Sequence, residues 1–139
     1  MDDLELYPVQ SKDIMTVEYV DEVISLLNSY HERNPGLLST AEIFESLLNG
    51  SKMLWVGKKE DTIEMILITE FQNESFFIIL WVTKSGWDFS TWYPLIMSKL
   101  EQFARYFKCK ELKAMARKGL AKKLKQDWDH EYCIITKQL

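Results

Sequence analysis

The sequence predicts one α/β domain over residues 1–139, with a mixed central sheet and helices on both faces. Three observations support this fold class. The chain of 139 residues is 47% hydrophobic, which is enough to bury a core. Its middle third alternates short apolar runs with polar turns, a pattern typical of antiparallel strands. An apolar strand, a long amphipathic helix and another strand then follow within residues 75–116 and predict a parallel crossover.

The first fifty residues predict an edge strand and two helical regions. Residues 4–9 are the strand, which must lie at an edge because its proline cannot donate a ladder hydrogen bond. Residues 12–33 space their apolar side chains by three and four, which predicts an amphipathic region made of one helix or two pieces. The Ser-Thr pair at 39–40 can cap a second helix that runs to Leu48, with Glu42 placed for a capping box.

The middle of the chain predicts a three-stranded meander. Its strands are Met53–Gly57, Ile63–Phe71 and Ser75–Thr83, which are joined by short polar turns. The third strand is apolar almost without interruption, so both of its faces should be buried.

The second half predicts alternating helices and strands. Ser90 or Thr91 caps the long helix, and Pro94 lies in its first turn, where a missing amide proton costs little. A short strand at 111–116, a basic helix at 118–126 and a final strand at 132–136 follow. The expected order is therefore β-α-α-β-β-β-α-β-α-β.

Composition excludes several classes of protein. No apolar run reaches the roughly 20 residues that a membrane helix needs, so no membrane partner is expected. The acidic N-terminus has no basic stretch and does not resemble a secretory signal. The two cysteines, Cys109 and Cys133, form no spaced framework, which favours a reduced protein of the cytoplasm.

Charge is distributed unevenly along the chain. Residues 1–50 carry two basic and ten acidic side chains, whereas residues 108–139 carry nine basic and four acidic ones. The overall charge of −4 argues against general nucleic-acid binding. The basic final segment is either a solvated helix face or a surface for a phosphate or an acidic partner.

Several short motifs follow one another in the second half of the chain. The long helix ends Leu-Glu-Gln-Phe-Ala-Arg at 100–105, a Lys-Cys pair follows at 108–109, and Ala-Arg-Lys-Gly-Leu follows at 116–120. The chain closes with Tyr-Cys-Ile-Ile-Thr-Lys at 132–137, and Leu-Trp-Val-Gly stands earlier, at 54–57. Together these motifs resemble phage-encoded proteins of the GNAT (N-acetyltransferase) superfamily. The resemblance covers roughly residues 37–139 and implies a single GNAT-like domain.

The chain departs from that superfamily at its phosphate-binding loop. A GNAT enzyme holds the CoA pyrophosphate on a loop of pattern Arg/Gln-x-x-Gly-x-Gly/Ala, whose backbone N–H groups bind the phosphates. Residues 83–92 instead hold one glycine, two tryptophans and an aspartate, which would obstruct or repel a pyrophosphate. We therefore expect no cofactor, or acetyl-CoA if the chain is an enzyme. In that case the resemblance assigns binding to Val82, Thr83, Lys84, Gly86, Arg117 and Lys118.

The resemblance also implies two residues for proton transfer. GNAT enzymes often use a strand glutamate as general base, acting through water, and a tyrosine as general acid. Glu70 and Tyr132 are the candidates, although an exposed strand-end acid and a packed strand aromatic would look the same. His31 and His130 lack metal-ligand spacing, so no metal is expected.

Two functions stay open, beside a third and less favoured one, a nucleic-acid accessory that uses the basic stretch Lys108–Lys125. The first is a non-catalytic, phage-encoded GNAT-like protein that works through protein partners such as phage structural proteins, in the host cytoplasm or the virion. The second is an active amine N-acetyltransferase that uses acetyl-CoA. If Trp87 and Trp92 fill the cleft between the 75–83 and 111–116 strands, the first is favoured. The sequence does not determine the oligomeric state or whether the chain is an enzyme.

Overall fold

A single mixed sheet forms the centre of the molecule. The computed structural model describes residues 4–33, 39–84, 86, 89–115, 129–131 and 134–139. In chain order the elements are β1 (Leu4–Val9), a 3-10 turn (Ser11–Asp13), α1 (Val20–Arg33), α2 (Thr40–Leu48), β2 (Met53–Lys59), β3 (Thr62–Gln72), β4 (Ser75–Thr83), α3 (Phe89–Tyr106), β5 (Glu111–Met115), β6 (Asp129–Glu131) and β7 (Ile134–Gln138). The strand order is β1-β2-β3-β4-β5-β7-β6, and only β4 and β5 are parallel.

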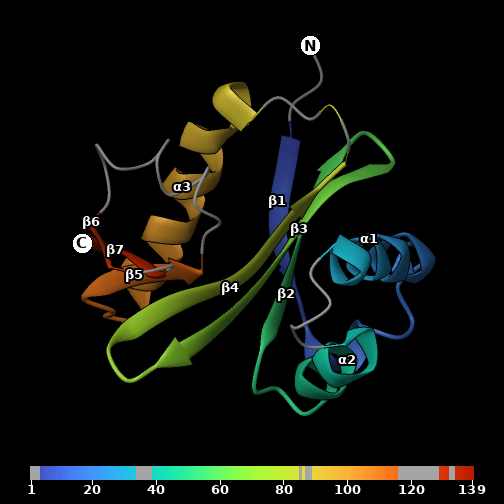
Figure 1. The fold of residues 1–139 in the computed structure, drawn as a ribbon, viewed down its shortest axis with the longest axis horizontal. Coiled ribbons are helices and arrows are strands. Elements are labelled where there is room, and N and C mark those ends of the chain that lie inside the picture. Colours follow the sequence, from blue (N-terminus) through green and yellow to red (C-terminus); the bar gives the residue numbers. More distant parts are fainter. Residues whose placement is uncertain (1–3, 34–38, 85, 87–88, 116–128, 132–133) are drawn as a thin grey trace.

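Helices cover both faces of the sheet, as the sequence predicts. Figure 1 shows α3 on one side of the strands and α1 with α2 on the other. Two buried clusters correspond to these layers. One joins α3 to the sheet through Phe76 and Leu100, and the other joins α1 and α2 to it through Leu27 and Leu47. Each layer gains its stability from apolar surface that is removed from water.

The two N-terminal helices match their predicted positions. The region 12–33 is broken in two, with a 3-10 turn before α1. The Ser39 hydroxyl accepts from the Glu42 backbone N–H at 3.2 Å, and the Glu42 carboxylate accepts from the Ser39 N–H at 3.3 Å, which completes the capping box. None of the described helices is long and apolar enough to cross a bilayer.

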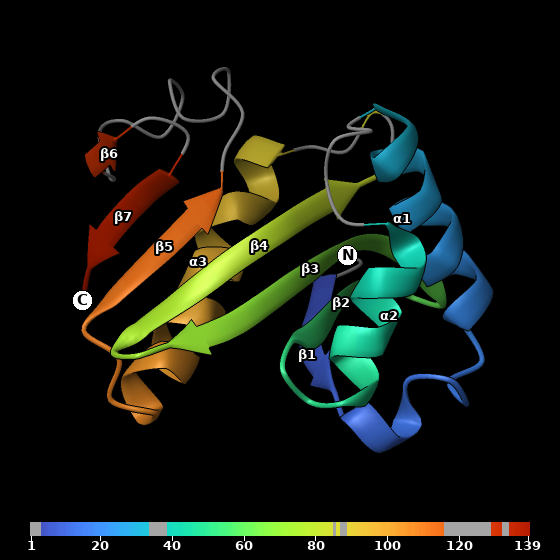
Figure 2. The ribbon, with the colours of Figure 1, turned by 60° about the horizontal axis from the view of Figure 1, so that its bottom comes forward.

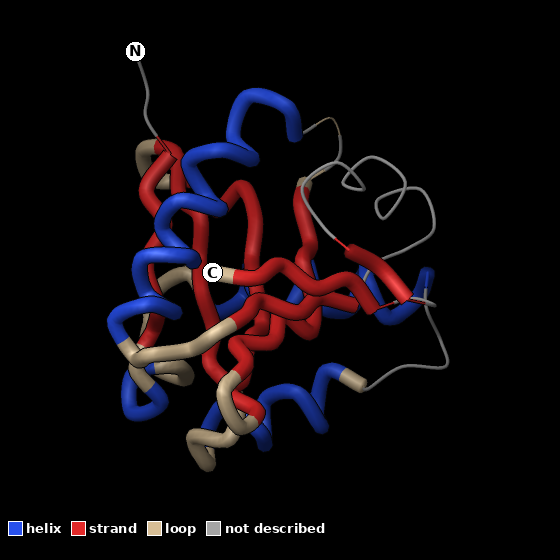
Figure 3. The backbone as a smooth tube through the Cα atoms, turned by 90° about the vertical axis from the view of Figure 1, so that its left-hand side faces the viewer, coloured by secondary structure: helices blue, strands red, loops and turns tan. Residues whose placement is uncertain are grey.

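The second half departs from the prediction at three places. The helix α3 begins at Phe89, so neither Ser90 nor Thr91 is its cap, and Pro94 lies one turn further in than expected. The final strand is Ile134–Gln138 rather than 132–136, and its end lies beside the start of β5 (Figure 3). A three-residue strand, β6, precedes it, and strands this short carry little periodic signal. The helix expected at 118–126 falls outside the described residues.

Candidate functional site

The strands β4 and β5 begin together and then separate, which opens the sheet at one place (Figure 2). Their parallel pairing covers only Ser75–Ile78 against Glu111–Ala114. The strand β4 continues to Thr83 and stays paired with β3 along that length. Its other edge, from residue 79 on, therefore has no strand beside it among the described residues. We call this opening the divergence.

A β-bulge marks the point where the strands separate. Opposite β3, Leu80 pairs with Ile68 and Ile78 pairs with Thr69, so Ile79 is one extra residue in β4. A bulge bends its strand and adds local twist. Neighbouring residues of a regular strand point to opposite faces of the sheet. Ile79 and Leu80 instead both pack on the α1–α2 side, which confirms the position of the bulge.

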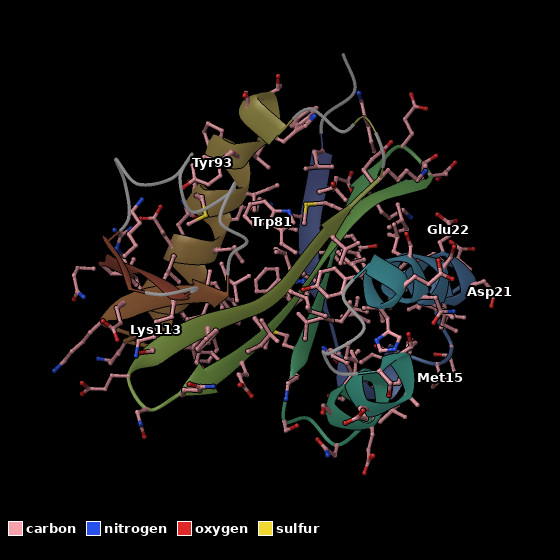
Figure 4. All side chains as sticks on the ribbon, in the orientation of Figure 1. Met15, Asp21, Glu22, Trp81, Tyr93 and Lys113 are labelled. Atoms are coloured by element: carbon pink, nitrogen blue, oxygen red, sulfur yellow. The ribbon has the colours of Figure 1, made fainter. Side chains whose placement is uncertain are left out.

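The bulge places Trp81 on the side of the sheet that faces α3. Its indole stacks on the ring of Tyr93 from the first part of α3, with centroids 6.3 Å apart and planes 15° from parallel. Figure 4 shows the two side chains between β4 and α3. Both are half-buried. An aromatic pair from strand and helix thus covers the α3 side of the divergence.

A hollow of about 390 Å³ continues from Tyr93 along α3 towards β7. Its polar end is a small charge cluster in which Glu101 lies 3.6 Å from Arg105 and 3.4 Å from Lys137. Because the carboxylate already lies between two cations, its role here is to tie α3 to β7.

The predicted cofactor residues are only partly brought together. Val82 is 2% exposed with its side chain in the α1–α2 core, so only its backbone can contact a ligand. Thr83 is half-buried, and Lys84 is exposed with its backbone N–H bonded to the Glu64 carbonyl at 2.9 Å. Gly86 has φ +78°, the left-handed region that glycine adopts most readily. Arg117 and Lys118 lie outside the described residues.

The predicted general base lies on the paired side of the bulge, opposite Phe77, which stands two residues before Ile79. Glu70 pairs with Phe77, whereas Val82 pairs with Ile66 four residues back along β3, a separation of roughly 13 Å. The Glu70 carboxylate is 3.6 Å from the Lys52 ammonium and accepts a hydrogen bond from the Gln72 side chain at 2.6 Å. The carboxylate is therefore already paired, near the turn that joins β3 to β4. The predicted acid, Tyr132, falls outside the described residues.

Of the two tryptophans considered as fillers of the cleft, the structure describes one, and it lies elsewhere. Trp92 is half-buried against the α3 core, with the Lys59 ammonium 5.6 Å from its ring centre, so it faces β2. Trp87 lies outside the described residues. Trp81 and Tyr93 take the position beside the divergence, and neither residue lies in a sequence motif that marks it for this position.

A polar clamp joins the three strands where β4 and β5 are still paired. The Ser75 hydroxyl donates to Glu111 at 2.7 Å, and the Gln138 side-chain amide donates to the other carboxylate oxygen at 2.9 Å. These hydrogen bonds, with the Lys113 ammonium at 3.4 Å, hold the pKa of Glu111 below its ordinary value. The clamp thereby fixes the closed end from which the strands diverge.

Replacing Glu111 with glutamine should lower the free energy of unfolding by roughly 1 kcal/mol at pH 7, since the carboxylate is partly screened by water. A depressed folded pKa contributes stability above the unfolded pKa, and that contribution is lost as pH falls through the folded pKa. The difference between wild type and variant should therefore shrink in acid below about pH 4. Urea denaturation of wild type and variant, at pH 7 and again below about pH 4, measures this difference in the free energy of unfolding. Glu74→Gln, in an exposed pair with Lys110, is the control and should change little; a difference of equal size at both pH values would contradict the clamp.

Comparison with solved structures identifies the fold. No protein-family model and no curated protein sequence matches the chain. The PaiA N-acetyltransferase of Thermoplasma acidophilum in complex with coenzyme A superposes with TM-score 0.70 over 99% of both chains, at 8% identity. A GNAT family acetyltransferase of Elizabethkingia anophelis with acetyl-CoA bound gives 0.69 over all of both chains, at 13% identity. An acetyltransferase of Thermus thermophilus gives 0.66 at 17% identity, over 98% of this chain and 97% of that one.

The chain therefore has the GNAT acetyltransferase fold along its length, which confirms the fold class expected from the sequence. Identities of 8–17% support no statement beyond the fold. What the chain does must be argued from its own residues.

Proposed function

We propose that this chain is a GNAT-fold protein that acts mainly through protein contacts, in a virion or in phage assembly, and not as an acyl-CoA transferase. The observation that carries the proposal is the Trp81–Tyr93 stack at the divergence. The phage setting rests on the motifs of the second half, such as the helix end Leu-Glu-Gln-Phe-Ala-Arg at 100–105. The site of action would then be the host cytoplasm or the virion.

Three features of the described residues support this proposal over an acyl-CoA enzyme. In that fold the pantetheine arm lies between the two diverging strands, and here two large rings cover one side of that space. Residues 79–83 of β4 are Ile, Leu, Trp, Val and Thr, so this edge brings no carboxylate, imidazole or amine to the divergence. Glu70, the predicted base, is held at the hairpin end by Lys52. Proton transfer needs a group within hydrogen-bond reach of the reacting atoms.

Calorimetry and thermal melting of the full chain with acetyl-CoA test this proposal. A ligand at one hundred times its dissociation constant stabilises a protein by about 2.7 kcal/mol, which raises the melting temperature by several degrees. We expect no such shift at millimolar acetyl-CoA and no saturable heat. Free CoA serves as the matched ligand control. Saturable binding of acetyl-CoA with a micromolar dissociation constant would contradict the proposal.

An active amine N-acetyltransferase is the second candidate. The divergence itself favours it, because the fold retains the open edge of β4, and two of the superposed acetyltransferases carry CoA or acetyl-CoA. Tyr93 would then be a further candidate for the acid beside Tyr132. Under this function, reversing the charge of Arg117 and Lys118 should weaken binding of CoA, and unchanged affinity in that double variant would count against it.

A further inference from the structure

An aromatic patch is exposed where α3 ends. Its members are Phe71, Tyr106 and Phe107, which are 43%, 80% and 52% exposed. The Phe107 ring lies 5.4 Å from that of Phe71 and 5.0 Å from that of Tyr106, so the three form one continuous surface. Arg105 and Lys108, both exposed, flank the aromatic pair in the chain, and the Arg105 guanidinium also lies 3.6 Å from Glu101. This aromatic patch therefore has a basic border, and aromatic residues and arginine are enriched at protein interfaces.

An apolar groove lies on the opposite side of the sheet, between α2 and the segment that leads into α1. It has a volume of about 760 Å³, and its walls include Met15, Ile24, Phe44 and Leu48. Met15 and Leu48 are 55% and 49% exposed, which leaves much of their apolar surface in water. Burying such side chains against a partner would be favourable.

The border of the apolar groove is acidic. Glu45 is one of its walls, and the exposed carboxylates of Asp13 and Glu18 lie on either side of Met15 in the chain. Over residues 1–50 acidic side chains outnumber basic ones by ten to two. The groove and the aromatic patch are thus alike in being apolar at the centre and opposite in the charge of their borders.

We propose that the aromatic patch of one copy of this chain docks in the apolar groove of a second copy. The carboxylates at Glu45 and Asp13 would face Arg105 and Lys108, which favours encounter and fixes orientation. The two surfaces belong to opposite layers of the sheet, with α3 on one side and α1 with α2 on the other (Figure 1), so one chain cannot satisfy both by itself.

Such a contact is heterologous, because each copy uses two different surfaces. Heterologous contacts repeat from copy to copy and produce either a closed ring or an open chain. The proposal rests on the proposed function, since it names a second copy as a protein partner. Self-association is measured without acetyl-CoA, so its failure is separate from the outcome of the acetyl-CoA titration.

Sedimentation velocity and light scattering of the full chain over a range of concentrations test the proposal. We expect the mean mass to rise with concentration, and the rise to weaken at high salt as the charged borders are screened. Tyr106→Glu alters the patch and Leu48→Glu alters the groove, both at exposed positions where the fold should persist. Each change should weaken self-association by about tenfold or more. Met15→Glu is a second groove variant in case Leu48→Glu fails to fold.

Mixing the two variants separates this arrangement from a symmetric dimer. Tyr106→Glu keeps an intact groove and Leu48→Glu keeps an intact patch, so an equal mixture should form complexes of two copies and grow no further. Thr62→Glu, an exposed change of equal charge at the turn between β2 and β3, should leave the association of wild type unaltered. A wild type that is monomeric at every concentration in low salt would overturn the proposal. The proposal would also be overturned if the mixture of Tyr106→Glu and Leu48→Glu did not associate, or if only one of these variants weakened self-association.

Discussion

Replacing Phe76 with alanine should lower the free energy of unfolding by about 3–5 kcal/mol, the usual cost of removing a buried aromatic ring. Phe76 is fully buried in β4 and lies between the sheet and α3. Its ring centre is 5.4 Å from that of Phe103 on α3 and 6.4 Å from that of Trp55 on β2. Its loss would leave a cavity between two layers, one of which carries the divergence. Domains of this size have free energies of unfolding of about 5–15 kcal/mol, so the loss is a large fraction of the total.

Chemical denaturation at neutral pH measures this loss, with Phe71→Ala as the matched control. Phe71 is the same residue type in the neighbouring strand, 5.1 Å from Phe76 between ring centres, but it is 43% exposed. The control should cost about 1 kcal/mol, because the exposed ring buries less apolar area and its removal leaves no closed cavity. Equal losses in the two variants would show that Phe76 does not hold the layers together.

Deleting Ile79 should remove the bulge from β4 and draw β4 and β5 together beyond Ile78. The remaining side chains would still alternate between the two faces of the sheet. Leu80 would stay on the α1–α2 side and Trp81 on the α3 side. A regular strand bends less than a bulged one, so Leu80 should come opposite Met115. The deletion should cost about 1–2 kcal/mol for the half-buried side chain that is lost. It should also reduce any binding of a ligand in the divergence.

Hydrogen exchange of the backbone amides measures the change in pairing. Amides of β4 beyond the deletion and of the end of β5 should exchange about fivefold more slowly, since each added hydrogen bond contributes about 1 kcal/mol. Ile79→Ala is the matched control: it removes most of the side chain and keeps the extra residue, so exchange should stay as in wild type. Unaltered exchange in the deletion variant would mean that the bulge is not what separates the strands.

The sequence predicted most elements well because their signals are local. The Ser39 capping box, the polar turns of the meander and the three-to-four spacing of α1 depend on residues a few positions apart. The predicted start of α3 was too late. The helix begins at Phe89, so Ser90 and Thr91, both good capping residues, lie inside its first turn.

The candidate site was much less predictable. Glu70 lies near the end of a strand, as predicted, and the antiparallel register of β3 and β4 places it opposite Phe77, before the bulge at Ile79. That register is a long-range property. The stack of Trp81 on Tyr93 joins residues from two elements, and neither residue carries a motif that marks it.

The sequence by itself determined the fold class and the order of most elements, since both follow from composition, periodicity or a short motif. Only the tertiary structure decided where β4 bulges and which aromatic rings lie at the divergence. The physical reason lies in β4 itself. A strand that is buried on both faces is apolar throughout, so its sequence carries no alternation from which an extra residue could be recognised. The bulge at Ile79 becomes visible only when β3 and the two helical layers show which way each side chain points.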